Sequence, residues 1–278
     1  MKKFNIILIW ALAIVLVCGF ALLPDCVGCK NIEVLNKDGL YIFKIPRNSG
    51  HEIKTYVTED LVYNKQVFKD TDAELVINAG YFDTKNNETT SYVVVDNNLA
   101  LDPTLNKNLM GNKSLQPYMK QILNRTEFRV LDCADEIKYD ISSHNTRVPY
   151  RCKIKYSVQA GPLVYPDLRL KREYFLVTKG HEVLRDSIQA LQRRPRTIIG
   201  IKNQDVYFIV ATVQKPLSLI EIQDICAELN LDKAMNLDGG GSTSVDFKGT
   251  NNPDFKDLHI VSEKNNTARK LKSFILVY

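Results

Sequence analysis

The sequence lacks the features that would place a metal or a nucleotide. It has only four histidines, and they are scattered along the chain at His51, His144, His181 and His259. Zinc sites need clustered His and Cys ligands, and two-metal phosphodiesterases need a cluster of His and Asp. No Gly-Lys-Ser or Gly-Lys-Thr occurs, so a nucleotide P-loop is disfavoured. Each histidine is expected to be an ordinary surface or core residue, and no cofactor is predicted.

A strong excess of one charge is also missing. The chain has 37 Lys and Arg against 32 Asp and Glu, a net charge of +5. This mild excess does not indicate nucleic acid or an anionic membrane surface as a partner. There is no internal repeat or low-complexity segment. The length allows one large domain with a substantial core, which we place at residues 37–278 after a short linker at residues 24–36.

The one long uncharged apolar run lies at the start of the chain. Residues 6–23 carry no charge, and Lys2 and Lys3 precede them. This pattern predicts a signal peptide or an N-terminal membrane anchor over residues 1–23, with the lysines in the cytoplasm. The run just reaches bilayer-spanning length, and cleavage could follow Ala21, so both interpretations stay open. The rest of the chain is expected to be extracytoplasmic, either secreted or tethered to the membrane by this segment.

The six cysteines support an oxidising compartment only weakly. Cys133 and Cys152 could form a disulfide across a loop-rich stretch. Cys26 and Cys29 could form a small bridge or a redox pair. Cys226 falls on the apolar face of a predicted helix and is expected to be a core residue.

Strand patterns dominate the rest of the chain. Runs rich in β-branched and aromatic residues predict strands at residues 40–45, 52–57, 74–78, 91–95, 157–164, 197–201, 206–213, 233–237 and 273–278. The first two are expected to form an opening hairpin or an edge. Residues 103–150 look irregular, with one short helix near residues 117–123. The class is α+β or mixed α/β, with a twisted mixed sheet flanked by helices.

One strand–helix–strand unit is clear. A strand at residues 205–213 is followed by Ser218, which can form a capping box with Glu221 and so begin a helix. The apolar face of that helix repeats at helical spacing through Ile222, Ile225, Cys226 and Leu229. A short strand at residues 233–237 comes next. This order predicts a right-handed crossover between parallel strands, with Asp238 just past the carboxyl end of the second strand.

The most informative stretch is Asn236-Leu237-Asp238-Gly239-Gly240-Gly241-Ser242-Thr243. Glycine runs are kept where the backbone turns sharply or lies close to a ligand, although a tight strand connection without a ligand is an equal alternative. A serine-hydrolase elbow is disfavoured because the sequence around Ser242 lacks the second glycine. The residues that follow alternate like a strand, so no helix amino terminus is available to hold an anion.

Four patterns occur in order: Asn78-Ala79-Gly80-Tyr81-Phe82-Asp83, Ala160-Gly161-Pro162-Leu163, Arg196-Thr197-Ile198-Ile199-Gly200 and the glycine turn. Together they resemble the phosphodiester glycosidase family, and the resemblance spans roughly residues 72–278. The first pattern departs slightly, because Ala79 and Tyr81 stand where many members have Gly and Phe. The added hydroxyl of Tyr81 could alter ligand contacts.

The resemblance implies hydrolysis of the bond between the anomeric carbon of a sugar and a phosphodiester oxygen. The implied substrate is a sugar-1-phosphodiester or a related cell-surface glycan. Asp238 is the first candidate for the catalytic carboxylate, as base, nucleophile or stabiliser of an oxocarbenium-like carbon. Asp83 is the second, although it could equally cap a turn. Arg196 is the candidate for binding phosphate, because a guanidinium fork matches phosphate oxygens.

Further substrate-binding candidates are small or polar residues in the same four patterns: Asn78, Gly80, Tyr81, Gly161, Thr197, Asn236, Gly239, Gly240, Gly241, Ser242 and Thr243. Asn78 and Asn236 could instead tie strand ends to their neighbours. Arg193 and Arg194 are expected to form a solvated basic loop. No metal site is predicted, although Asp83 or Asp238 could hold a divalent cation.

Two other classes of function compete with hydrolysis at the sugar carbon. The first is a carbohydrate-binding or envelope-assembly protein that keeps the pocket without turnover. The second is a phosphodiesterase that cuts phosphorus–oxygen bonds, and the missing His and Asp cluster disfavours it.

Overall fold

The computed structural model describes residues 31–134, 136–249, 255, 257–262 and 268–278. The predicted export segment at residues 6–23 and the Cys26 and Cys29 pair lie outside the described residues. Among the residues that are described, no helix is both long enough and apolar enough to cross a membrane.

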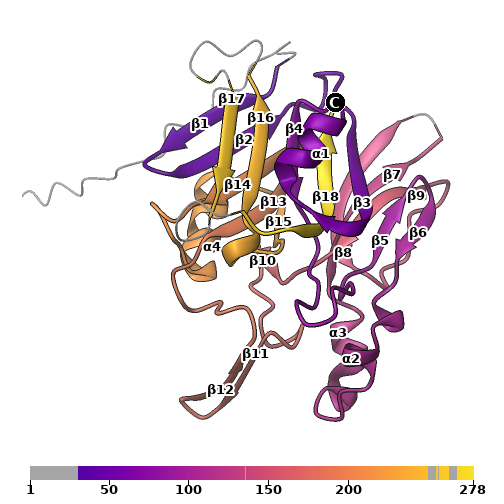
Figure 1. Cartoon of the computed structure of the whole chain (residues 1–278), viewed down its shortest axis with the longest axis vertical. Coiled ribbons are helices and arrows are strands. Elements are labelled where there is room, and N and C mark those ends of the chain that lie inside the picture. Colours follow the sequence, from indigo (N-terminus) through magenta and orange to yellow (C-terminus); the bar gives the residue numbers. More distant parts are fainter. Residues whose placement is uncertain (1–30, 135, 250–254, 256, 263–267) are drawn as a thin grey trace, which may run out of the picture.

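The fold is built from three antiparallel sheets and a two-stranded ribbon (Figure 1). The first sheet has the order β1 (Glu33–Lys37), β2 (Leu40–Ile45), β14 (Asp205–Ala211), β13 (Arg196–Lys202), β15 (Lys233–Asn236) and β10 (Leu163–Tyr165). The second has the order β17 (Asp257–Val261), β16 (Ser244–Lys248), β4 (Leu75–Asn78), β18 (Leu271–Val277) and β3 (Ile53–Val62). The third has the order β6 (Asn98–Leu101), β5 (Val93–Val95), β9 (Lys153–Gln159), β7 (Thr126–Asp132) and β8 (Ile137–Ser143).

The ribbon consists of β11 (Leu176–Lys179) and β12 (Glu182–Asp186), and it extends away from the body of the molecule at the bottom of Figure 1. The α-helices are α1 (Asn64–Asp70), α2 (Lys107–Met110), α3 (Met119–Ile122) and α4 (Leu219–Glu228). Single turns of 3-10 helix are η1 (Pro103–Leu105), η2 (Gln116–Tyr118) and η3 (Gly240–Ser242). The predicted capping box is confirmed, because the Ser218 hydroxyl accepts from the Glu221 amide and the Glu221 carboxylate accepts from the Ser218 amide.

The first sheet is buried on both faces, which explains why its strands are almost uniformly apolar. In β14, Val206, Phe208 and Val210 join the central core, which also takes residues from the second and third sheets. The alternate residues Tyr207 and Ile209 face the other way, into a cluster that includes the apolar side of α4. Because side chains alternate along a strand, β14 contributes to the hydrophobic clusters on both faces of the first sheet.

The sheet predicted to be mixed is antiparallel instead, since every strand pairing in the described part of the chain is antiparallel. Strands β14 and β15 both pair with β13, which lies between them. They therefore run in the same direction without being neighbours, and α4 joins them. The hand of this connection stays a prediction.

Three other expectations need correction. Of the two alternatives for the opening strands, the hairpin is wrong, because β2 lies inside the first sheet. The edge alternative holds for β3, which forms an edge of the second sheet. The last residues of the predicted linker, from Glu33, belong to β1. The stretch 103–150 is not mainly irregular, since it contains β7 and β8 as well as the expected helix near residue 119.

The remaining local predictions are confirmed. Residues Arg196–Lys202 and Asp205–Ala211 form a hairpin, and Gly161 and Pro162 separate β9 from β10. The Cys133–Cys152 disulfide is present. It links the end of β7 to the start of β9, two neighbouring strands of the third sheet. Cys226 is buried and unpaired in the cluster under α4.

Candidate active site

A polar cavity of about 740 Å³ opens where β13 and β16 begin and β15 ends. The glycine turn supplies one wall, and residues 186–189 and 194–196 supply another. Ser262 and Arg269, which follow β17 and precede β18, also line it. The predicted residues that line this cavity are Tyr81, Arg196, Asn236, Asp238, Gly239, Gly240 and Gly241.

Backbone hydrogen bonds fix the glycine turn against its neighbours. The Leu237 amide donates to the Thr197 carbonyl at 2.8 Å, and the Asp238 amide donates to the Ala79 carbonyl at 2.9 Å. The Gly240 amide then donates to the Pro195 carbonyl at 2.9 Å. Gly240 has a φ of +60°, and a Cβ at Gly239 would lie 3.1 Å from the Pro195 carbonyl oxygen. Glycine is thus required by the backbone conformation and the close packing.

Asp238 is half-buried beside this turn. Burial raises the pKa of its carboxyl to about 6, against the opposing effects of the Ser242 hydroxyl, the Gly239 amide and the charge of Arg269. The amide contact is a hydrogen bond of 2.9 Å from Gly239 to Asp238 Oδ1. Ser242 lies near enough to affect the pKa but forms no hydrogen bond of standard geometry. No ion pair to Asp238 occurs among the described residues.

Asn78 ties strand ends together below the cavity, which is the alternative to substrate binding that the sequence allowed. Its Nδ2 donates to the Asp238 carbonyl at 2.6 Å. Its Oδ1 accepts from Thr197 Oγ1 at 2.8 Å and from the Ser244 amide at 3.2 Å. The Thr197 hydroxyl also lies 3.4 Å from that of Thr243. These buried side chains support Asp238 from beneath and do not line the cavity.

Tyr81 and Asn236 form a second polar pair at the cavity wall. Tyr81 Oη donates to the Gly161 carbonyl at 2.9 Å and accepts from Asn236 Nδ2 at 2.6 Å. Burial raises the pKa of Tyr81, so its hydroxyl stays protonated. Within the part of the chain that the structure describes, Asn236 Oδ1 is buried without a hydrogen-bond partner, as are the hydroxyls of Ser242 and Ser262. Buried polar atoms without partners are uncommon in folded proteins, and three of them gather around this one cavity.

Arg196 does not present a free fork to the cavity. Its Nε donates to the Leu217 carbonyl at 3.2 Å, and Nη1 donates to the Ile188 carbonyl at 3.0 Å. Its Nη2 donates to the carbonyls of Gln189 at 2.6 Å and Gln192 at 3.0 Å. Four of the five donors that a guanidinium carries are therefore occupied. This geometry favours a positioning role for Arg196 at the cavity wall and disfavours the predicted phosphate fork.

We expect Arg196→Met to destabilise the fold by about 3 kcal/mol, because hydrogen bonds to a charged group are strong and four carbonyls lose their donor. Urea unfolding measures the change. Arg193→Met is the matched control, since Arg193 is exposed and pairs only with Glu221; it should alter stability by less than about 1 kcal/mol. Equal stability of the two variants would contradict the positioning role.

Asp83 lies away from Asp238 and lines a separate surface cavity with Lys107 and Asn108. Its Oδ1 accepts from the Lys85 amide at 2.9 Å, and its Oδ2 accepts from Asn108 Nδ2 at 2.9 Å. This is the turn-capping alternative. The structure therefore does not bring the two predicted carboxylates together, and a joint catalytic role for them is disfavoured.

Two predicted glycines serve packing rather than ligand contact. A Cβ at Gly80 would lie 2.9 Å from Ser91 Cβ. Gly161 has a φ of +80°, and its Cβ would collide with Glu173 Oε2. Neither glycine lines the cavity of Asp238, although the Gly161 carbonyl orients Tyr81.

Several cavity residues were missed by reasoning from sequence. Ser262 and Arg269 come from a segment without a motif, and Asp186 begins the loop opposite the glycine turn. The Asp186 carboxylate caps that loop, since its Oδ1 accepts from the Ala190 amide at 2.7 Å and its Oδ2 from the Leu191 amide at 3.3 Å. Among the described residues, Asp186 and Asp238 are the carboxylates that line the cavity, and of these two Asp238 does not cap the opposite loop.

The described residues include no group of three or more His, Cys, Asp or Glu side chains that could hold a metal ion. The use of a divalent cation stays a prediction that these residues do not test.

The chain is similar to known proteins in sequence and in fold. The model of the phosphodiester glycosidase family matches residues 71–278, so the chain belongs to this family. It is also similar to the zebrafish N-acetylglucosamine-1-phosphodiester alpha-N-acetylglucosaminidase catalytic domain auto-inhibited by its pro-peptide. That match has 12% identity and a TM-score of 0.59, and it covers 89% of this chain and 81% of that one. No curated protein matches the chain.

Two further solved structures share the fold. A hypothetical protein from Synechocystis has 16% identity and a TM-score of 0.57, over 88% of this chain and 61% of that one. A candidate exported protein from Burkholderia pseudomallei K96243 has 12% identity and a TM-score of 0.52, over 86% and 73%. The chain thus spans less than two thirds of the Synechocystis protein, and at these identities the likeness concerns the fold.

Proposed function

We propose that this protein is an extracytoplasmic glycoside hydrolase that cleaves the sugar C1–O bond of sugar-1-phosphodiesters or related surface glycans. The observation that carries the proposal is the Asp238 carboxyl, which has a raised pKa, stands on a rigid glycine turn and lines a large polar cavity. Family membership favours the same reaction class. The uncharged apolar run at residues 6–23 favours a location outside the cytoplasm, with the membrane as a partner if the run is retained.

In this reaction, the bond between C1 and the phosphate oxygen breaks and its electron pair leaves with the phosphate. Water supplies the oxygen that joins C1. One of its protons stays on the new hydroxyl group, and the other passes to the carboxylate or to solvent. A phosphate leaving group has its second ionisation near pH ~6 and needs little help from an acid. What the reaction does need is negative charge beside the developing oxocarbenium-like carbon. Ionised Asp238 supplies that charge.

Hydrolysis of a panel of sugar-1-phosphate methyl diesters by the purified protein tests the proposal. The panel would include the diesters of glucose-1-phosphate and N-acetylglucosamine-1-phosphate, with reducing sugar as the readout. We expect release of reducing sugar and methyl phosphate from at least one of them. If none is hydrolysed, the proposal fails and the non-catalytic carbohydrate-binding alternative takes its place.

The raised pKa of Asp238 predicts the pH dependence of hydrolysis. An unperturbed aspartate has a pKa of about 3.9, whereas burial brings that of Asp238 to about 6. Because the ionised form is the active one in this proposal, kcat/KM should rise with pH and level off above about 6. A pH–rate profile on the best diester of the panel measures this limb. A profile that instead falls above pH 6 would make Asp238 a general acid and contradict its assigned role.

A further inference from the structure

The second buried arginine near this site has an unusual set of partners. Arg125 stands immediately before β7 and is only 8% exposed. Its Nε donates to the Glu173 carbonyl at 3.1 Å, and its guanidinium lies 3.8 Å from the centre of the Phe175 ring. Within the described part of the chain, its two terminal nitrogens have no hydrogen-bond partner and no carboxylate at ion-pair distance. Neither nitrogen is sealed from solvent.

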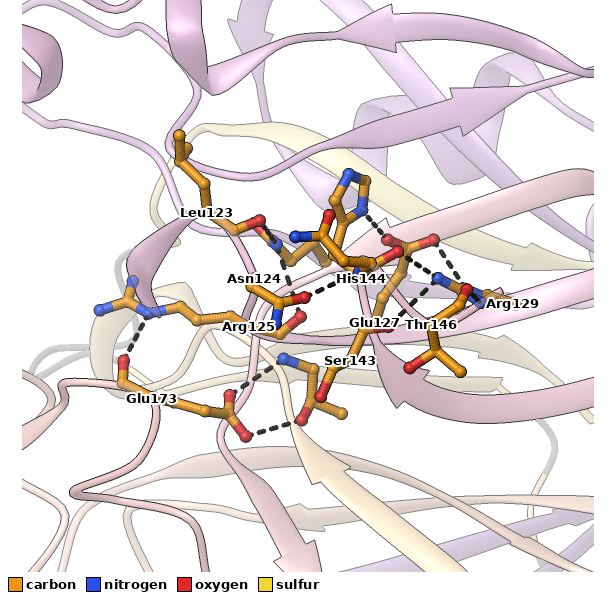
Figure 2. Close-up of polar contacts among 12 residues, drawn as sticks. Leu123, Asn124, Arg125, Glu127, Arg129, Ser143, His144, Thr146 and Glu173 are labelled. Atoms are coloured by element: carbon orange, nitrogen blue, oxygen red, sulfur yellow. Dashed lines mark hydrogen bonds and ion pairs between the residues drawn. The ribbon is translucent and has the colours of Figure 1, made fainter. Parts of the chain in front are cut away.

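Arg129 lies within β7, four residues after Arg125, and its surroundings differ (Figure 2). It is 1% exposed, and all three of its nitrogens have partners. Its Nε bonds Glu127 at 3.2 Å, and Nη1 bonds the Thr146 carbonyl at 2.9 Å. Its Nη2 bonds the carbonyls of Ser143 at 3.2 Å and His144 at 2.5 Å. Figure 2 shows the Arg125 guanidinium directed away from this network, with the Glu173 carbonyl as its one partner.

The carboxylate of Glu173, whose charge acts on Arg125, is hydrogen-bonded to other groups. Glu173 accepts from the Thr126 amide at 3.0 Å, from Thr126 Oγ1 at 2.7 Å and from the Leu163 amide at 2.9 Å. Burial lowers the pKa of Arg125 to about 10, so the guanidinium remains charged at neutral pH. A buried charge without a partner is costly unless something neutralises it. Glu173 and Tyr81 act on the charge of Arg125 without bonding its terminal nitrogens. Those nitrogens are therefore left with donors that an anion from outside could use.

Arg125 does not itself line the Asp238 cavity, but ring contacts lead from its guanidinium to Tyr81 at the cavity wall. The Phe175 ring under its guanidinium also contacts the ring of Tyr81, with 5.9 Å between centres. Tyr81 lines the cavity and is bonded to Asn236. The charges of Arg125 and Asp238 both act on the pKa of the Tyr81 hydroxyl, in opposite directions. Arg185 is a second cation near Arg125, since its charge helps to lower the pKa of Arg125. Its guanidinium lies 5.1 Å from the centre of the Tyr174 ring.

We propose that the free fork of Arg125 binds the phosphate group of a ligand whose sugar lies against Asp238. This inference rests on the proposed function and places its phosphate subsite. Two parallel N–H donors on one guanidinium match two phosphate oxygens. Arg125 has them, whereas the corresponding donors of Arg196 are held by the carbonyls of the 188–192 loop. The ring of Phe175 holds the guanidinium plane in place before the ligand arrives.

Titration calorimetry with inorganic phosphate and with glucose-1-phosphate tests the inference without requiring turnover. We compare the full protein with its Arg125→Gln and Arg125→Lys variants, and use Arg129→Lys as the matched disturbance of a buried arginine. Arg125→Gln should weaken binding of both anions at least tenfold, and Arg125→Lys should keep part of it because its charge remains. Methyl glucoside, which has no phosphate, should bind all folded variants equally.

Unchanged phosphate affinity in Arg125→Gln would overturn the inference, as would a wild-type protein that binds neither anion. Circular dichroism establishes that each variant is folded, and if Arg125→Gln does not fold, Arg125→Lys carries the test through its partial loss. The proposed function fails in a different way. If no diester is hydrolysed but the loss in Arg125→Gln is seen, the phosphate subsite stands and the glycosidase does not. If diesters are hydrolysed and Arg125→Gln binds phosphate normally, the reverse holds.

Discussion

Asp238→Asn is expected to reduce kcat on a sugar-1-phosphodiester by at least about 1,000-fold while leaving ligand affinity within a few-fold. Losing one group of a catalytic set typically has an effect of this size. The amide has nearly the shape of the carboxyl and can still accept from the Gly239 amide, so the turn should stay intact. It cannot carry the negative charge that stabilises the oxocarbenium-like carbon. Steady-state kinetics and calorimetry with glucose-1-phosphate measure the two quantities.

Asp83→Asn is the matched control, since it makes the same chemical change in the other motif-derived aspartate. Because Asp83 lines a different cavity, this variant should keep near-wild-type turnover. Substantial turnover by Asp238→Asn would remove the basis of the proposed function. A wild-type protein that binds the sugar but never turns it over would favour the non-catalytic alternative.

Deleting Ser273–Tyr278 is expected to abolish folding. These residues include most of β18, which is an interior strand of the second sheet and pairs with both β4 and β3. The deletion would leave two strands without their shared partner and would remove Phe274 and Leu276 from the cluster beneath α1. Circular dichroism and a thermal melt should give no cooperative transition.

Two milder variants keep this prediction quantitative. Phe274→Ala should cost about 3–5 kcal/mol, the usual range for a buried phenylalanine truncated in a packed core. Removal of Tyr278 alone should have a small effect, because Tyr278 is 37% exposed and lies beyond the strand. A cooperative melt after the full deletion would show that β18 is dispensable to the fold.

Local sequence signals are sufficient for the glycine turn and for Asp238. Three consecutive glycines after a short apolar strand leave few conformations, and the structure places the carboxyl just beyond the end of β15 as expected. The partners of Asn78 depend on distant strands, since it bonds residues near 197 and 244. The sequence could therefore offer strand-tying as an alternative but could not choose it.

Arg196 marks the limit of motif reasoning. A guanidinium next to a family pattern is a reasonable phosphate ligand when its surroundings are unknown. Its donors are instead taken by carbonyls of a loop that approaches only in the folded chain. The sequence around Arg125 gives no signal for a binding role. Its terminal nitrogens are available because no described residue bonds them in the folded chain. Such properties of unsatisfied groups can be read only from three-dimensional packing.

The strands β7 and β8 were missed for a physical reason. In β7, Glu127 and Arg129 interrupt the apolar pattern, yet both are buried and bonded to each other. A sequence pattern counts such residues as exposed, whereas the fold hides them as a pair. Strands β14 and β15 on either side of α4 run in the same direction, but a strand–helix–strand order does not reveal that β13 lies between them.

Hydrolysis in oxygen-18 water tests the central claim most directly, because it identifies the bond that breaks. The account predicts that the label enters the released sugar at C1 and that the phosphomonoester keeps only unlabelled oxygen. Label in the phosphate instead would mean phosphorus–oxygen cleavage and would contradict a reaction centred on Asp238 and the anomeric carbon.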